Sequence, residues 1–174
     1  MKKLETNRLL LRPFCPNDAS VVEELAGNKE VADTTLSIPH PYLKGMALPW
    51  IESLKEKAES GELLTWAITL KKTQNLVGCI SLSVALEHQR AELGYWLGRP
   101  YWGMGIMTEA AHNVIQFGFE ELKLNQIFAR AMRRNPASIR VMEKIGMKHE
   151  GILPQHVKKW GVYKDLVYYG ILKD

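Results

Sequence analysis

The stretch that most constrains the fold is YWGMGIMTEA, residues 101–110, in which Gly103 and Gly105 stand between a predicted strand and a predicted helix. Glycine lets a backbone adopt conformations that other residues rarely reach, and it lets a ligand approach the main chain closely. Free N–H groups at the start of a helix, aided by the helix dipole, bind anions. The turn therefore predicts either an anion site or a bend that serves only the path of the chain.

Two familiar nucleotide-binding motifs do not fit this turn. A P-loop needs Gly-Lys followed by Ser or Thr, whereas Gly105 is followed by Ile and Met. A dinucleotide fingerprint needs a third small residue where Thr108 stands. It also needs an acidic residue about 20 positions further on, where Glu120 and Glu121 still belong to the predicted helix. A phosphate site of this turn must therefore be of another kind.

Hydrophobic periodicity and turn residues divide the chain into alternating elements. The predicted strands are residues 9–14, 65–70, 76–84, 91–97, 127–132, 156–160 and 164–172. One predicted helix is capped by Asn17 or Asp18, the others cover residues 50–60, 108–122 and 138–145, and the proline-containing stretch 36–49 is expected to be a loop. The pattern predicts one α/β (α+β) domain over residues 1–174, with antiparallel meanders and one strand–helix–strand crossover around the glycines.

Composition narrows the class of protein. Hydrophobic residues make up 46% and charged residues 24% of the 174 positions, as in globular domains, and the net charge of +4 suits an anionic ligand and solubility equally well. Lysine and arginine are spread along the chain, so we expect no nucleic-acid-binding stripe. The two cysteines and five histidines lack metal-ligand spacing, which predicts reduced thiols and no metal site. Charges interrupt the apolar N-terminal run, so we expect a cytoplasmic protein without a membrane span.

Four short motifs occur in the order typical of one known family. They are E-x-G-Y-W (92–96), W-G-x-G (102–105), N-x-x-S (135–138) and E-K-x-G (143–146), all within Ala91–Gly151. This segment resembles the acetyl-CoA-binding core of the GNAT acetyltransferases, above all the branch of the ribosomal-protein-alanine N-acetyltransferases. The chain ends, LETNRLLLRPF and YKDLVYYGILK, extend the resemblance to nearly the whole chain. It implies the GNAT fold, a mixed, mostly antiparallel sheet of about seven strands flanked by helices, with splayed strands around the acetyl-CoA site.

The resemblance implies where the cofactor binds. The glycine turn would hold the diphosphate of coenzyme A, and free main-chain groups of strand 91–97 would pair with the pantetheine arm. An N–H there, that of Leu97 or a neighbour, would polarise the acetyl carbonyl. Trp102 takes the place of Arg or Gln in the family motif, and Met107 that of the final Gly or Ala, so the Met107 side chain must point away from the phosphates. The implied cofactor-binding residues are Tyr95, Trp96, Leu97, Trp102, Gly103, Met104, Gly105, Ile106, Met107, Thr108, Asn135, Ser138, Arg140 and Lys144.

The resemblance also implies two catalytic residues. Glu92 resembles the glutamate proposed as general base in some relatives, and Ser138 resembles the serine suggested to protonate the leaving thiolate. The plainer alternatives are a solvated strand-end carboxylate for Glu92 and a helix N-cap for Ser138. Tyrosine has the acid role in other members, so Tyr101 and Tyr163 are further candidates.

The implied reaction is direct transfer of an acetyl group from acetyl-CoA to a primary amine in a ternary complex, by a monomer or homodimer. An α-amine of pKa about 7.7–8.0 is roughly 10–20% neutral at pH 7, whereas lysine, near 10.4, is neutral about once in a few thousand. A weak base therefore favours a protein or peptide N-terminus, such as that of a ribosomal protein. Family members place the acceptor beside the loop 36–49, where Tyr42 and Trp50 are candidate contacts unless they are core residues. Two alternatives stay open: a small-molecule amine acetyltransferase, and a non-catalytic acyl-CoA-binding or sensing module in which Met107 obstructs the turn.

Overall fold

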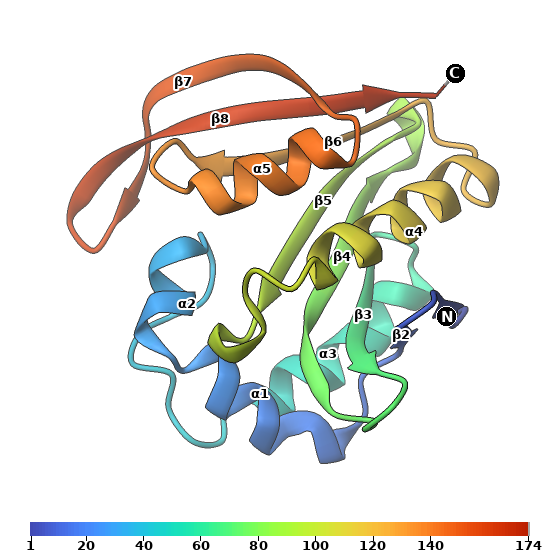
Figure 1. Ribbon diagram of the computed structural model, residues 1–174, viewed down its shortest axis with the longest axis vertical. Helices are drawn as coiled ribbons and strands as arrows, with labels where there is room; N and C mark the ends of the chain where they lie inside the picture. The colour runs from blue at the N-terminus through green and yellow to red at the C-terminus, as the bar shows by residue number, and fades with distance from the viewer. Residues whose placement is uncertain (174) are drawn as a thin grey trace.

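The computed structural model describes residues 1–173 and contains one eight-stranded sheet in the order β1-β2-β3-β4-β5-β6-β8-β7 (Figure 1). The strands are β1 (Leu4–Glu5), β2 (Leu9–Arg12), β3 (Leu63–Leu70), β4 (Leu76–Ala85), β5 (Arg90–Leu97), β6 (Gln126–Met132), β7 (Lys148–Lys159) and β8 (Val162–Leu172). The helices are α1 (Ala19–Ala26), α2 (Lys29–Thr34), α3 (Ala47–Glu59), α4 (Ile106–Glu120) and α5 (Pro136–Lys144). Short 3₁₀ turns cover η1 (Pro16–Asp18), η2 (Leu86–His88) and η3 (Arg99–Tyr101).

The order of the strands follows from short antiparallel connections and one crossover. All neighbouring strands run antiparallel except β5 and β6, which are parallel and are joined through α4. A parallel pair needs such a long connection, usually a helix. The predicted crossover around the glycines is therefore confirmed, and the sheet is mixed and mostly antiparallel, as expected.

Side chains of the central strands alternate between two hydrophobic cores, one on each face of the sheet. On β3, Trp66 and Ile68 belong to the larger core, which α4 and α5 cover. Ala67, which lies between them, belongs to the smaller core with residues of α1, α2 and α3. In Figure 1, α4 and α5 cross the face of the sheet turned toward the viewer. Alternation with period two thus assigns neighbouring residues of a strand to opposite faces.

Several predicted boundaries need correction. The sequence did not predict α2, a helix of six residues, and α3 begins at Ala47 rather than Trp50. Strand β7 begins at Lys148 rather than residue 156. Its first half was not predicted, because most of its residues are exposed and lack the expected alternation. The Asp18 side chain does not cap α1, since its carboxylate instead accepts hydrogen bonds from Arg12 and from the Cys15 N–H. Within residues 1–173, no helix is long and apolar enough to cross a membrane.

Candidate active site

The glycine turn joins η3 to the first residue of α4 and presents a row of main-chain donors. Gly103 and Gly105 have φ values of +77° and +72°, in the left-handed region that favours glycine. Among the described residues, no hydrogen bond engages the N–H groups of residues 103–108, which include the first three of the helix. A Cβ added at Gly103 would have nothing within 4 Å. The turn is thus open to a ligand and combines free donors with the positive end of a helix dipole.

Trp102 anchors the turn to the end of β5. Its indole Nε1 donates to the Leu97 carbonyl oxygen at 2.7 Å, and the Arg99 guanidinium lies 4.8 Å from the centre of its ring. The side chain is therefore occupied with holding the turn in place.

Met107, the departure from the family motif, does not obstruct the turn. Its side chain is only 6% exposed and packs in the larger core, as does its neighbour Ile106. Because the side chain points into the core, the Met107 N–H remains at the open start of α4. The steric reason for a non-catalytic module is therefore absent.

Strands β5 and β6 separate beyond their third pair of residues. Their pairing ends at Glu92 and Phe128, whereas β5 stays paired with β4 as far as Leu97. The Gly98 N–H donates to the Val77 carbonyl of β4 at 2.8 Å. Because bonded and non-bonded pairs alternate along an antiparallel ladder, the main-chain groups of Leu97 point the other way, toward the gap. The expected splay is present, with the N–H groups of Leu97 and Tyr95 directed into it.

Two hydroxyl groups meet at the α5 side of the gap. The Tyr95 Oη and the Ser138 Oγ are 2.8 Å apart and either can be the donor, and the Tyr95 hydroxyl has the Ser138 carbonyl at 3.3 Å as an alternative acceptor. Burial raises the pKa of the Tyr95 hydroxyl to about 12, although the bond to Ser138 acts in the opposite direction. Tyr95 therefore stays protonated at neutral pH.

Ser138 is not the N-cap of α5, contrary to the alternative prediction. The cap is Asn135, whose Oδ1 accepts from the Ser138 N–H at 3.1 Å, because α5 begins two residues earlier, at Pro136. The Asn135 Nδ2 donates to the Thr34 carbonyl at 3.2 Å. Capping by Asn135 leaves the Ser138 hydroxyl free to pair with Tyr95.

Glu92 lies on the opposite face of the sheet from Tyr95, because an odd number of positions separates them on β5. Both oxygens of its carboxylate accept from Arg130, at 2.7 Å from Nε and 2.9 Å from Nη2. The two side chains are 27% and 30% exposed and line a hollow of about 270 Å³ together with Tyr168. Arg130, which the sequence did not single out, thus fixes the position of the Glu92 carboxylate through two hydrogen bonds.

Ion pairs connect helix α2 to both sides of the gap between β5 and β6. The Glu30 carboxylate accepts from the Arg99 Nε at 2.6 Å, next to the glycine turn. The Asp33 carboxylate accepts two bonds from Arg134, at 2.7 and 2.8 Å, just before α5. These two ion pairs connect the turn to the start of α5 across the gap.

The remaining predicted residues are either exposed on α5 or packed against the smaller core. Arg140 and Lys144 are exposed on α5, Trp96 packs against the smaller core, and their predicted contacts with the cofactor stay predictions. Trp50 meets Phe14 edge-on with ring centres 5.1 Å apart, a contact typical of a core residue. Tyr42 is half-buried against the same core, and burial next to Glu23 raises its pKa.

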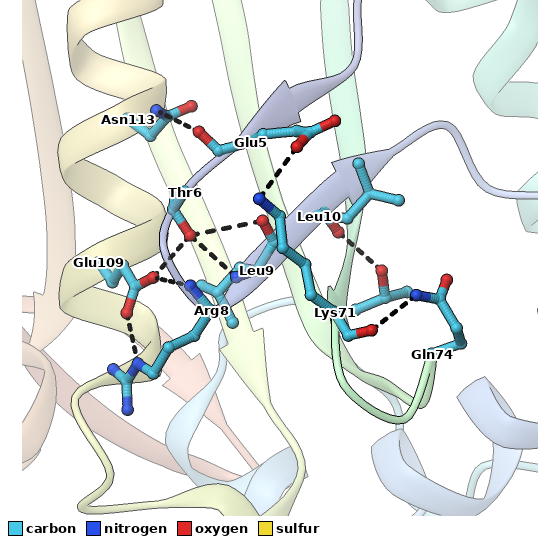
Figure 2. Close-up of polar contacts among 10 residues, drawn as sticks. Glu5, Thr6, Arg8, Leu9, Leu10, Lys71, Gln74, Glu109 and Asn113 are labelled. Carbon is cyan, nitrogen blue, oxygen red and sulfur yellow. Dashed lines mark hydrogen bonds and ion pairs between the residues drawn. The ribbon is translucent and has the colours of Figure 1, made fainter.

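The sequence also gave no reason to connect Glu109, in the first turn of α4, with Arg8. The Arg8 Nε donates to the Glu109 carboxylate at 2.6 Å (Figure 2). The Arg8 Nη1 donates to the Met104 carbonyl at 3.0 Å, so this pair adjoins the glycine turn. An acidic residue in a first helical turn is a common signal, but its partner lies 101 positions away. A larger groove of about 510 Å³ runs along α4 past His112 and holds none of the predicted site residues.

Comparison with known proteins identifies the family of the chain. Residues 8–148 match the family described as the acetyltransferase (GNAT) domain. A Bacillus licheniformis protein named as an uncharacterised N-acetyltransferase, p20, is 30% identical over 174 residues, which are 99% of this chain and 97% of that protein. The crystal structure of a GNAT-family acetyltransferase from Bacillus anthracis has a TM-score of 0.83 at 28% identity and covers 98% of both chains. RimL, a ribosomal L7/L12 α-N-protein acetyltransferase in complex with coenzyme A, has a TM-score of 0.90 and covers 98% of both chains, but at 18% identity the likeness concerns the fold alone.

Proposed function

Because the chain belongs to the GNAT family of acetyltransferases, we propose that this acyltransferase moves the acetyl group of acetyl-CoA to the α-amine of a protein or peptide N-terminus. The observation that carries the proposal is the continuity between the open donors of residues 103–108 and the gap beside Leu97. A diphosphate on the turn would leave the pantetheine arm to run along β5. Its amides would pair with main-chain groups that β6 does not engage.

The acetyl carbonyl would lie at the Leu97 end of this path. Attack by an amine produces a tetrahedral intermediate whose negative oxygen needs a donor. The Leu97 N–H points into the gap and already has a fixed direction, because its peptide unit is shared with the Trp96 carbonyl and β5 stays paired with β4 as far as Leu97. A donor fixed before the reaction stabilises developing charge without reorganisation, an effect worth about 10²–10³ in rate.

Glu92 is the proposed general base for the acceptor amine. Both oxygens of its carboxylate accept from Arg130, and it lies five residues from Leu97 along β5, roughly 16 Å at about 3.3 Å per residue, so it would take the proton of the amine through a chain of water molecules. An N-terminal α-amine is already roughly 10–20% neutral at pH 7, so it needs little help from a base. The neutral fraction of a lysine side chain is lower by about two and a half powers of ten, which favours the α-amine as acceptor.

The departing thiolate would meet the Tyr95–Ser138 pair. The Ser138 hydroxyl would donate to the sulfur while the Tyr95 hydroxyl donates to the Ser138 Oγ, in keeping with the 2.8 Å between the two hydroxyl oxygens. Full transfer of the tyrosine proton, of pKa about 12, to a thiolate whose thiol has a pKa of about 8.5 would cost about 5 kcal/mol. The pair therefore stabilises the thiolate by hydrogen bonding, and solvent supplies the proton of the final thiol.

The acceptor is proposed to enter near the loop after α2 and the tip of the β7–β8 hairpin. These segments lie together: the rings of His40 and Trp160 are 5.9 Å apart, and the Lys159 Nζ donates to the Ile38 carbonyl at 3.2 Å. RimL acts on a ribosomal-protein α-amine according to its name, and it has the same fold. A ribosomal protein N-terminus is accordingly the acceptor class that we favour.

The test is an amine panel with acetyl-CoA, followed by release of free thiol. The panel holds peptides with free N-termini of varied first residue, the same peptides N-acetylated but with an internal lysine, and spermidine as a small amine. We expect turnover of free N-termini, with far slower reaction of the blocked peptides and spermidine. Faster reaction of spermidine would replace the peptide acceptor by a small amine. Binding of acetyl-CoA without turnover of any amine would instead support a sensing module.

A further inference from the structure

The turn between β1 and β2 binds the first turn of α4 through one carboxylate, that of Glu109 (Figure 2). Its Oε1 accepts from the Thr6 hydroxyl at 2.6 Å and from the Arg8 main-chain N–H at 2.9 Å. Its Oε2 accepts from the Arg8 Nε at 2.6 Å. Although burial opposes the shift, these hydrogen bonds lower the pKa of Glu109, so the carboxylate stays charged and fixes the Arg8 guanidinium.

The fixed guanidinium reaches the glycine turn itself. The Arg8 Nη1 donates to the Met104 carbonyl at 3.0 Å. In a trans peptide unit the C=O and the N–H point in opposite directions, and the Met104 carbonyl shares its peptide unit with the Gly105 N–H. Holding this carbonyl toward Arg8 therefore directs the Gly105 N–H to the other side of the turn, away from Arg8.

From this geometry we infer that Arg8, held by Glu109, is a positioning residue for the diphosphate of acetyl-CoA, an inference that rests on the proposed function. Two glycines in the left-handed region would otherwise leave the turn free to adopt many conformations. Arg8 fixes one of them before the cofactor arrives. It also neutralises the Glu109 carboxylate, whose charge would repel a phosphate at the start of α4.

The Arg8–Glu109 ion pair is expected to contribute little to the free energy of unfolding. The Arg8 side chain is 48% exposed, and exposed ion pairs contribute little to folding. The chain offers a matched control in the same region, the pair of Lys71 with Glu5 at 2.9 Å, in which the lysine is 37% exposed. Figure 2 shows that this second pair joins β1 to the turn after β3. Among the described residues, no hydrogen bond of either side chain reaches residues 102–108.

The experiment compares two acetyl donors in Arg8→Ala, Arg8→Lys and Lys71→Ala. Acetyl-CoA carries the diphosphate, whereas S-acetylpantetheine lacks it. We expect Arg8→Ala to raise KM for acetyl-CoA about tenfold, the ratio equivalent to ordering one backbone residue on binding, with kcat within about twofold. Its kcat/KM for S-acetylpantetheine should equal that of the parent. Lys71→Ala should match the parent with both donors.

Arg8→Lys separates geometry from charge. A single ammonium cannot reproduce the planar fork that binds a carboxylate and a carbonyl together, so most of the KM increase should remain. Full rescue by lysine would overturn the positioning role in favour of charge alone. An equal loss with both donors would also overturn it, while the proposed function would stand as long as the parent transfers acetyl groups.

Two measurements keep the result interpretable. Titration of each variant with coenzyme A reports affinity without turnover, and Arg8→Ala should again bind about tenfold more weakly than the parent. Thermal unfolding shows whether Arg8→Ala is folded. If it is not, Glu109→Gln, which keeps one accepting oxygen and replaces the other by an NH2 group that cannot accept a hydrogen bond, should show a smaller loss in the same direction, and unchanged affinity would refute the inference. A parent that binds no coenzyme A would refute the proposed function first.

Discussion

Replacing Gly105 by alanine should weaken cofactor binding much more than it weakens the fold. Gly105 has a φ of +72°, and a Cβ there would meet nothing closer than the Arg8 Nη2 at 3.6 Å, an ordinary contact. The penalty in stability is therefore conformational, about 1 kcal/mol, which lowers Tm by about 2–4 °C in a chain of this size.

The loss of affinity should be larger, because alanine favours backbone angles that turn the Gly105 N–H away from the diphosphate. A hydrogen bond to a charged group contributes about 1.5–3 kcal/mol, so losing one raises the Kd for coenzyme A about 10- to 150-fold. Titration calorimetry at one temperature, with thermal unfolding of the same samples, measures both effects.

Gly61→Ala is the matched control. Gly61 follows α3, has a φ of +76°, and a Cβ there would meet nothing within 4 Å. It should lose about as much Tm as Gly105→Ala while keeping the affinity of the parent. Equal affinities in the two variants would refute the assignment of the diphosphate to this turn.

Three further substitutions test the chemistry and the fold. Glu92→Gln should lower kcat at pH 7 by about 5- to 10-fold, because roughly 10–20% of an α-amine is neutral without a base, and it should leave coenzyme A affinity unchanged; parental rates at every pH would exclude Glu92 as the base. Tyr95→Phe removes the hydroxyl 2.8 Å from Ser138 and should lower kcat by about tenfold or more with an unchanged Kd, whereas an unaltered kcat would remove the pair from the mechanism. Asp18→Asn should cost about 2–3 kcal/mol in urea unfolding at pH 7, because Asp18 is 6% exposed and bound by Arg12. Burial would raise the pKa of Asp18, but the hydrogen bonds from Arg12 and Cys15 lower it below its usual value. The stability that the Asp18 carboxylate contributes is therefore complete above pH about 4 and is lost as the pH falls through the lowered pKa. A deficit that persists undiminished at low pH would contradict this.

Features that depend on residues close together in the sequence could be predicted from it. The glycine turn, the crossover and the central strands were predicted because hydrophobic period, turn residues and helix starts are local signals. The first half of β7 was missed because its exposed residues give no alternation. The short helix α2 was missed because a single turn and a half carries little periodic signal.

The polar pairs of the site could not be predicted in this way. Tyr95 and Ser138 are 43 positions apart, Glu92 and Arg130 are 38 apart, and Arg8 and Glu109 are 101 apart. Each pairing depends on the register of the sheet or on how a helix packs against it, which sequence patterns do not specify. The family resemblance supplied Glu92 and Ser138 as candidates, but it did not supply the partners that fix them.

The two ion pairs of α2 make the rim of the gap a cooperative unit. Six residues are too few for a helix that is stable in isolation, so α2 owes its order to its contacts with the rest of the protein, including those through Glu30 and Asp33. Fraying of α2 would release Arg99 beside the glycine turn and Arg134 beside α5 together. The side chains of Arg99 and Arg134 would then gain or lose order in one event, although they lie on different sides of the gap between β5 and β6.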